Sequence, residues 1–113
     1  MYIKVKLCMI RYGGTIVAKA PDWYQPPSSM EHYDGRSKRL LVVQLKIPFC
    51  NGYIPVGVRL WNSARGLYLM FQDALIPLMK KVMEQTRCIE ALLPVEHLPE
   101  QVEEPEQKAA AKA

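Results

Sequence analysis

Cationic and aromatic side chains alternate with aliphatic ones between residues 38 and 72. From Ile54 to Trp61 the even-numbered residues are aliphatic, whereas Arg59 and Trp61 occupy odd positions. In a β-strand, this alternation puts Arg59 and Trp61 together on the face opposite the aliphatic residues. Cationic groups bind phosphates and exposed rings stack on unpaired bases, so this face favours binding of single-stranded nucleic acid, DNA or RNA.

The candidate binding residues on this face form two chemical groups. Four cations are expected to contact phosphates: Lys38, Lys46, Arg59 and Arg65. Three rings are expected to stack on bases: Tyr53, Trp61 and Tyr68. The alternative is that a helix packs on this face and buries Trp61, although the opposite, aliphatic face is the better surface for a helix.

No pattern in the sequence indicates catalysis, a cofactor or a metal site. His32 and His97 have no nucleophile or carboxylate at an informative spacing. Asp22, Glu31 and Asp34 could converge as acid–base groups, but such residues are more often turn formers with solvated charges. A phosphate-binding loop and the GxGxxG and GxSxG motifs are absent from the sequence. We therefore predict a non-enzymatic binding protein without a cofactor.

The three cysteines, Cys8, Cys50 and Cys88, are widely separated and odd in number. Without CxxC or Cys/His ligand spacing, they are expected to be reduced structural thiols of a cytoplasmic protein rather than disulfides or metal ligands. No apolar run reaches the ~18 residues of a membrane span. The N-terminal residues alternate charged with apolar side chains, which differs from an export signal.

Charge is distributed unevenly along the chain. Residues 1–88 contain 13 Lys and Arg against 5 Asp and Glu, a net charge of +8, whereas residues 89–113 have a net charge of −4. A basic body with an acidic tail favours an anionic ligand, and the tail would compete with that ligand for the basic body. The alternative is an ordinary solvated surface with a solubilising tail.

Two hairpins are predicted from glycine-containing turns. The pair at 13–14 joins strands at 2–11 and 15–20 and places Met9 opposite Ala18. Asn-Gly at 51–52 favours a two-residue turn that places Leu45 opposite Val58. That register also sets one proline, at 48, against another, at 55, so two ladder hydrogen bonds would be lost near the turn.

Between the hairpins, residues 21–37 form a long loop rich in proline and aromatic residues. Such loops either carry function or pack down over a sheet edge. The loop supports an alternative function, a protein-binding adaptor or inhibitor module that also offers a sheet edge for strand addition. Its candidate partner-binding residues are Trp23, Tyr24 and Tyr33.

After a short strand at 67–71, an apolar stripe through Leu75, Met79, Val82 and Ile89 predicts a long amphipathic helix that ends at Pro94. The predicted fold is α+β, a bent antiparallel sheet of about five strands with this C-terminal helix on its aliphatic face. The sequence thus predicts one domain at 1–93 and a disordered acidic tail rich in Pro, Glu and Ala at 94–113.

The segments Val58-Arg59-Leu60-Trp61 and Arg65-Gly66-Leu67-Tyr68-Leu69, followed by a helix, resemble the positive-cofactor-four transcriptional coactivator family over roughly residues 38–88. Tyr68 departs from the polar residue of that family's pattern. The segment from Arg65 is also similar to the SpoVG regulator family. Both resemblances imply a regulatory protein that binds nucleic acid, and the first implies a single-stranded ligand and a homodimer formed through the helix.

Overall fold

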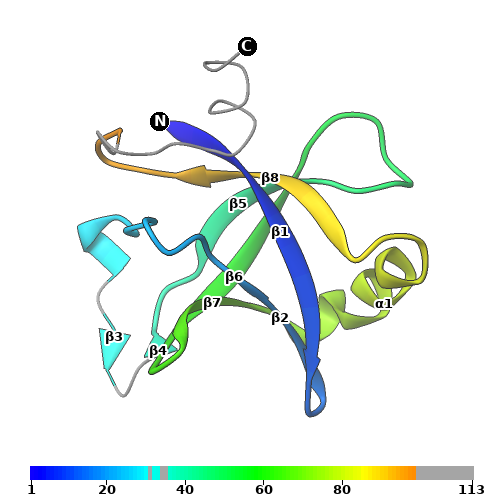
Figure 1. The fold of residues 1–113 in the computed structure, drawn as a ribbon, viewed down its shortest axis with the longest axis horizontal. Coiled ribbons are helices and arrows are strands. Elements are labelled where there is room, and N and C mark those ends of the chain that lie inside the picture. The colour runs from blue at the N-terminus through cyan, green and yellow to red at the C-terminus, as the bar shows by residue number, and fades with distance from the viewer. Residues whose placement is uncertain (31, 34–35, 99–113) are drawn as a thin grey trace, which may run out of the picture.

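The computed structural model describes residues 1–30, 32–33 and 36–98 (Figure 1). Six strands form its main body: β1 (Tyr2–Tyr12), β2 (Thr15–Lys19), β5 (Leu41–Lys46), β6 (Ile54–Ser63), β7 (Gly66–Phe71) and β8 (Cys88–Pro94). The remaining elements are short: β3 (His32–Tyr33), β4 (Arg36–Ser37), the 3-10 turns η1 (Ser28–Met30) and η2 (Asp73–Leu75), and the helix α1 (Ile76–Gln85).

The six long strands close into an antiparallel barrel. They follow one another in the order β6, β5, β8, β1, β2, β7, and β7 pairs again with β6. The short strand β4 adds to β6 through Arg36 and Trp61, and β3 pairs with β4. The predicted open, bent five-stranded sheet with a long helix is therefore wrong, because the chain forms a closed and mostly β structure.

The strand β8 explains this difference, because residues 88–94 belong to the end of the predicted helix but form a strand. Ile89, Ala91 and Leu93 alternate with less buried neighbours and face the barrel interior. The helix ends instead at Gln85, and the backbone of the next residue, Thr86, is extended (φ −153°, ψ 146°). β8 then pairs with β1 on one side and β5 on the other. Ile89 fits both a helical stripe and a strand face, so local periodicity could not decide between them.

The first predicted hairpin is confirmed, with Met9 opposite Ala18 and Gly13 at φ 59°. The second has the wrong register, because Leu45 pairs with Ile54 rather than Val58. β5 ends before Pro48, so residues 47–53 form a longer loop in place of a two-residue turn. A proline has no N–H for the ladder, which explains why pairing stops there. The shift is even, so the predicted inside and outside faces of both strands are preserved.

Inward side chains from all six strands fill the barrel, and α1 adds Ile76, Met79 and Val82 to the same core. Leu78 and Met83 of α1 and Leu75 of η2 are partly buried against it. The helix stripe thus packs on the barrel of its own chain. The homodimer through the helix stays a prediction, which sedimentation at micromolar concentration tests.

The loop after β2 packs against the barrel through buried side chains. Tyr24 is 5% exposed, and its hydroxyl donates a hydrogen bond of 2.6 Å to the carbonyl oxygen of Pro94. Beyond β8, the Val95 N–H donates to the carbonyl oxygen of Met1, and the Glu96 carboxylate accepts from the Ser28 N–H. Residues 95 and 96 therefore contact the barrel and this loop, while residues 99–113 of the predicted tail lie outside the described residues.

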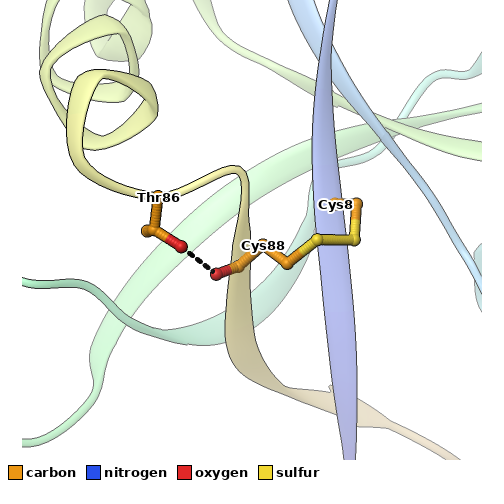
Figure 2. The surroundings of a disulfide bond; sticks show 3 residues. All are labelled: Cys8, Thr86 and Cys88. Carbon is orange, nitrogen blue, oxygen red and sulfur yellow. Dashed lines mark hydrogen bonds between the residues drawn. A yellow bond between two sulfur atoms is a disulfide. The ribbon is translucent and has the colours of Figure 1, made fainter.

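Cys8 and Cys88 form a disulfide between β1 and β8 (Figure 2). The prediction of three reduced thiols is wrong for these two residues, whereas Cys50 is free and exposed. The predicted helix includes residue 88, so the sequence alone did not indicate this bond. Only the pairing of β1 with β8 brings two cysteines that are 80 positions apart directly opposite each other.

Candidate nucleic-acid interface

Four strands align a row of cationic and aromatic residues around the outside of the barrel. In the strand registers, Arg36 of β4 lies opposite Trp61 of β6. Trp61 lies opposite Tyr68 of β7, and Tyr68 lies opposite Lys19 of β2. The row thus consists of two rings with one cation at each end.

A third ring completes an aromatic cluster with Trp61 and Tyr68. The ring centroid of Tyr12, at the end of β1, lies 5.1 Å from that of Trp61, which is 5.3 Å from that of Tyr68. Tyr12 is 57% exposed, and the other two side chains are half-buried. We call these three residues the aromatic cluster. Sequence reasoning missed Tyr12, because β1 comes near β6 only when the barrel closes.

The cluster lies near an apolar patch of the outer wall. Val17 is only 2% exposed, yet its ladder partner Ile10 is 47% exposed and its neighbours Ile16 and Ala18 belong to the interior core. Val17 therefore faces outward, beneath the side chains of the outer wall.

Two cations near the cluster are held by hydrogen bonds. Arg59 Nη1 lies 3.3 Å from the carbonyl oxygens of Ser37 and Lys38, which ties the segment after β4 to β6. Lys19 Nζ lies 3.0 Å from Asp22 Oδ1, and this hydrogen bond raises the pKa of the lysine. Lys19 therefore has part of its charge compensated, whereas Arg59 donates only to neutral carbonyl groups in these two contacts.

The remaining predicted cations on this side are exposed. Lys38 follows β4 and offers its backbone oxygen to Arg59. Arg65 lies in the turn between β6 and β7, where its N–H donates to Ser63 Oγ at 3.2 Å. Arg36, which the sequence analysis did not select, is also exposed. Its position opposite Trp61 depends on the β4–β6 pairing and could not be found from local pattern.

Two predicted residues lie elsewhere on the barrel, where β5, β8 and β1 are neighbours. Lys46 is opposite Glu90, which is in turn opposite Lys6. The Tyr53 hydroxyl donates to the Glu90 carboxylate. This hydrogen bond lowers the pKa of Glu90, with help from nearby lysines, and raises the pKa of Tyr53. Neither Lys46 nor Tyr53 therefore joins the aromatic cluster.

The loop at 21–37 contains the residues predicted to bind a protein partner in the alternative function. Tyr24 is a core residue, and Trp23 is partly buried against the core with its ring centroid 6.4 Å from that of Tyr24. Tyr33 lies in β3, and its side chain is outside the described structure. Closure through β6 and β7 gives each of the six barrel strands a neighbour on both sides, while β4 and β3 extend the sheet from β6.

Searches found no family model, no curated protein and no solved structure that matches this chain. The resemblances to the coactivator and SpoVG families therefore stay predictions. Among the described residues, no helix has the length and apolar character needed to cross a membrane.

Proposed function

We propose that this protein binds single-stranded nucleic acid without catalysis, on the outer face of β6 and β7. The aromatic cluster carries the proposal, because three contacting rings on the outside of a small barrel do not belong to its interior core. Exposed aromatic rings stack on bases of any sequence, and each stacked base contributes ~1–3 kcal/mol to binding.

The cations next to the cluster support a nucleic-acid ligand over an apolar one. Arg36, Lys38, Arg59 and Arg65 are exposed on β4, β6 and their flanking turns. A backbone that passes along these residues would place phosphates near cations while its bases reach the rings. The ligand is single-stranded because the bases of a duplex are stacked on each other and do not present free faces.

The positions of these side chains also change the set of residues that we expect to contact the nucleic acid. Tyr12 joins Trp61 and Tyr68 as a stacking residue, and Arg36 joins the phosphate contacts. Lys46 and Tyr53 are left out, because Glu90 lies opposite the first and bonds to the second. The cytoplasmic location expected from the sequence stays a prediction, and the Cys8–Cys88 disulfide removes the part of its support that came from reduced thiols.

The test is a titration of a labelled single-stranded oligonucleotide, followed by anisotropy at two salt concentrations, with the matching duplex alongside. Arg36→Ala should weaken binding of the single strand and reduce the salt slope by about one unit. Lys80→Ala, which removes an equally exposed cation from α1, is the matched control and should leave the slope unchanged.

Binding would be assigned to net charge if the protein bound single strand and duplex equally tightly, or if Arg36→Ala and Lys80→Ala reduced the salt slope equally. Either result would overturn the proposal. Absence of binding to both DNA and RNA oligonucleotides would also overturn it and leave the protein-binding alternative.

A further inference from the structure

The Cys8–Cys88 disulfide lies at a junction of the barrel (Figure 2). The β1–β8 ladder runs from Tyr2 and Pro94 to Cys8 and Cys88. Beyond this pair, β1 continues beside β2, and the chain before β8 leads back to α1. The bond therefore joins β1 and β8 near the end of their ladder, one position before the Met9–Arg87 hydrogen bond.

The ladder geometry accounts for the bond at this position. The Met9 N–H donates to the Arg87 carbonyl oxygen at 2.9 Å, so residues 9 and 87 are a hydrogen-bonded pair. In an antiparallel ladder, pairs of the two kinds alternate, so Cys8 and Cys88 form a non-hydrogen-bonded pair. Side chains are closest at such pairs, and here the two Cα atoms are 4.0 Å apart.

The bond lies on the outer face, away from the core. Three of the four chain neighbours of the two cysteines, Leu7, Met9 and Ile89, point inward and are buried, whereas Arg87 is exposed. Cys8 is exposed, and Cys88 is half-buried. The backbone next to Cys88 is held by other contacts, since Thr86 Oγ1 donates to its carbonyl oxygen at 2.9 Å and Thr86 N–H donates to Val82. Opening the bond thus removes no side chain from the interior.

We propose that Cys8–Cys88 is a site of reversible thiol–disulfide exchange in the folded protein, with Cys8 Sγ as the attacked atom. The thiolate of a small thiol such as glutathione attacks this sulfur. A mixed disulfide forms on Cys8, the S–S bond to Cys88 breaks, and Cys88 leaves as a thiolate that takes up a proton. A second thiol attacks the mixed disulfide, which yields the Cys8 thiol and oxidised glutathione.

The disulfide-bonded protein and the reduced protein should differ in stability rather than in core packing. The bond connects residues 80 positions apart, so its loss returns a large loop-closure entropy to the unfolded chain. The reduced protein should stay folded at 25 °C with a melting temperature lower by roughly 10–20 °C. This inference does not depend on nucleic-acid binding.

The first experiment uses Cys50→Ser protein, which removes the remaining thiol from the count. Purified without reductant, it should contain no free thiol, and denaturation should reveal none. Native protein is then incubated with reduced glutathione, quenched by alkylation and analysed by mass spectrometry. A glutathione adduct on Cys8, followed by alkylation of both cysteines, is expected, with a rate that rises in proportion to glutathione concentration.

A rate that reaches a plateau at the global unfolding rate would overturn the proposal, since exchange would then need the unfolded chain. Free thiols in the untreated protein, or adducts mainly on Cys88, would overturn it as well. Loss of the folded circular-dichroism signal on reduction at 25 °C would show that the reduced form is not a folded state and would also overturn it.

Single cysteine variants, both in the Cys50→Ser background, provide a matched pair. With oxidised glutathione, Cys88→Ser should accumulate a stable adduct on the exposed Cys8. Cys8→Ser should form its adduct on the half-buried Cys88 more slowly. Equal rates for the two variants would contradict the assignment of Cys8 as the accessible sulfur.

Discussion

Trp61 is half-buried on the outside of the barrel. The sequence predicted either an exposed stacking residue or a residue buried under a helix, and neither describes this position fully. It is not covered by the helix, because α1 packs its apolar residues into the barrel core. It is also not fully open, because the rings of Tyr12 and Tyr68 lie at 5.1 and 5.3 Å. A base that stacks on Trp61 would therefore join an existing cluster rather than meet a lone ring.

Trp61→Ala should weaken oligonucleotide binding by ~1–3 kcal/mol with little change in salt slope. It should also lower the free energy of unfolding by about 1–2 kcal/mol through two lost ring contacts, less than the ~3–5 kcal/mol of a core tryptophan. Tryptophan fluorescence in a Trp23→Phe background checks the site. Blue-shifted Trp61 emission that added oligonucleotide does not quench would contradict it.

Tyr53→Phe should return the pKa of Glu90 toward its ordinary value of 4.5, because the hydroxyl is the main group that lowers it. A lowered carboxylate pKa gives stability that is present above the unfolded value and is lost as pH falls through the folded value. The variant should therefore lose less stability than the parent on acidification below pH 4.5. An NMR titration of the Glu90 carboxyl gives the shift directly, and an unchanged pKa would contradict the role of Tyr53.

At the scale of elements, β8 decides both the architecture and the disulfide. It lies between β1 and β5, and its last residue, Pro94, accepts the hydrogen bond from Tyr24. The loop at 21–30 is thereby attached to the strand that closes the barrel. Its aromatic residues pack mainly against the core, so this part of the loop covers the barrel rather than standing free to bind a partner.

Tyr24→Phe should cost about 1 kcal/mol at neutral pH, because the Pro94 carbonyl loses its donor. Burial raises the pKa of Tyr24 well above its ordinary value of 10.0. A raised pKa gives stability that is complete below the unfolded value and declines above it. The parent should therefore lose its advantage over the variant above pH 10. Denaturant unfolding at pH 7 and pH 11 measures this, and an equal difference at both values would contradict it.

At the scale of the whole molecule, the basic body and the acidic C-terminal region remain the main feature of the charge distribution. Some acidic residues of this region have structural roles: Glu90 bonds to Tyr53, and Glu96 bonds to Ser28. The other glutamates of this region lie beyond residue 98, outside the described residues. A competing tail would therefore begin at residue 99 rather than at the proline that ends β8.

Deleting residues 99–113 removes four glutamates and two lysines. If this segment competes with the ligand, the deletion should tighten oligonucleotide binding at low salt and have little effect at high salt, where charges are screened. The melting temperature should stay unchanged, because the contacts of Val95 and Glu96 remain. Anisotropy titrations at both salt concentrations measure the effect, and unchanged affinity at low salt would identify the segment as a solubilising tail.

The sequence alone determined the faces of the strands and the first turn. Alternation in β5 and β6 identified which side chains point inward, and the glycines at 13–14 gave the correct register of β1 with β2. These features were readable because each depends on neighbours a few residues apart. The location of Arg59 and Trp61 on the same outer face of β6 also follows from period-two alternation.

Tertiary structure decided the rest. Residues 88–94 fit a helix end or a strand equally well by local pattern, and only the space between β1 and β5 selected the strand. In the closed barrel, the ring of Tyr12 lies beside that of Trp61, Arg36 lies opposite Trp61, and Cys8 is bonded to Cys88. Each of these contacts joins residues more than 20 positions apart. Cross-strand neighbours depend on the order of strands in the sheet, and that order is a property of packing, which no local period in a single sequence encodes.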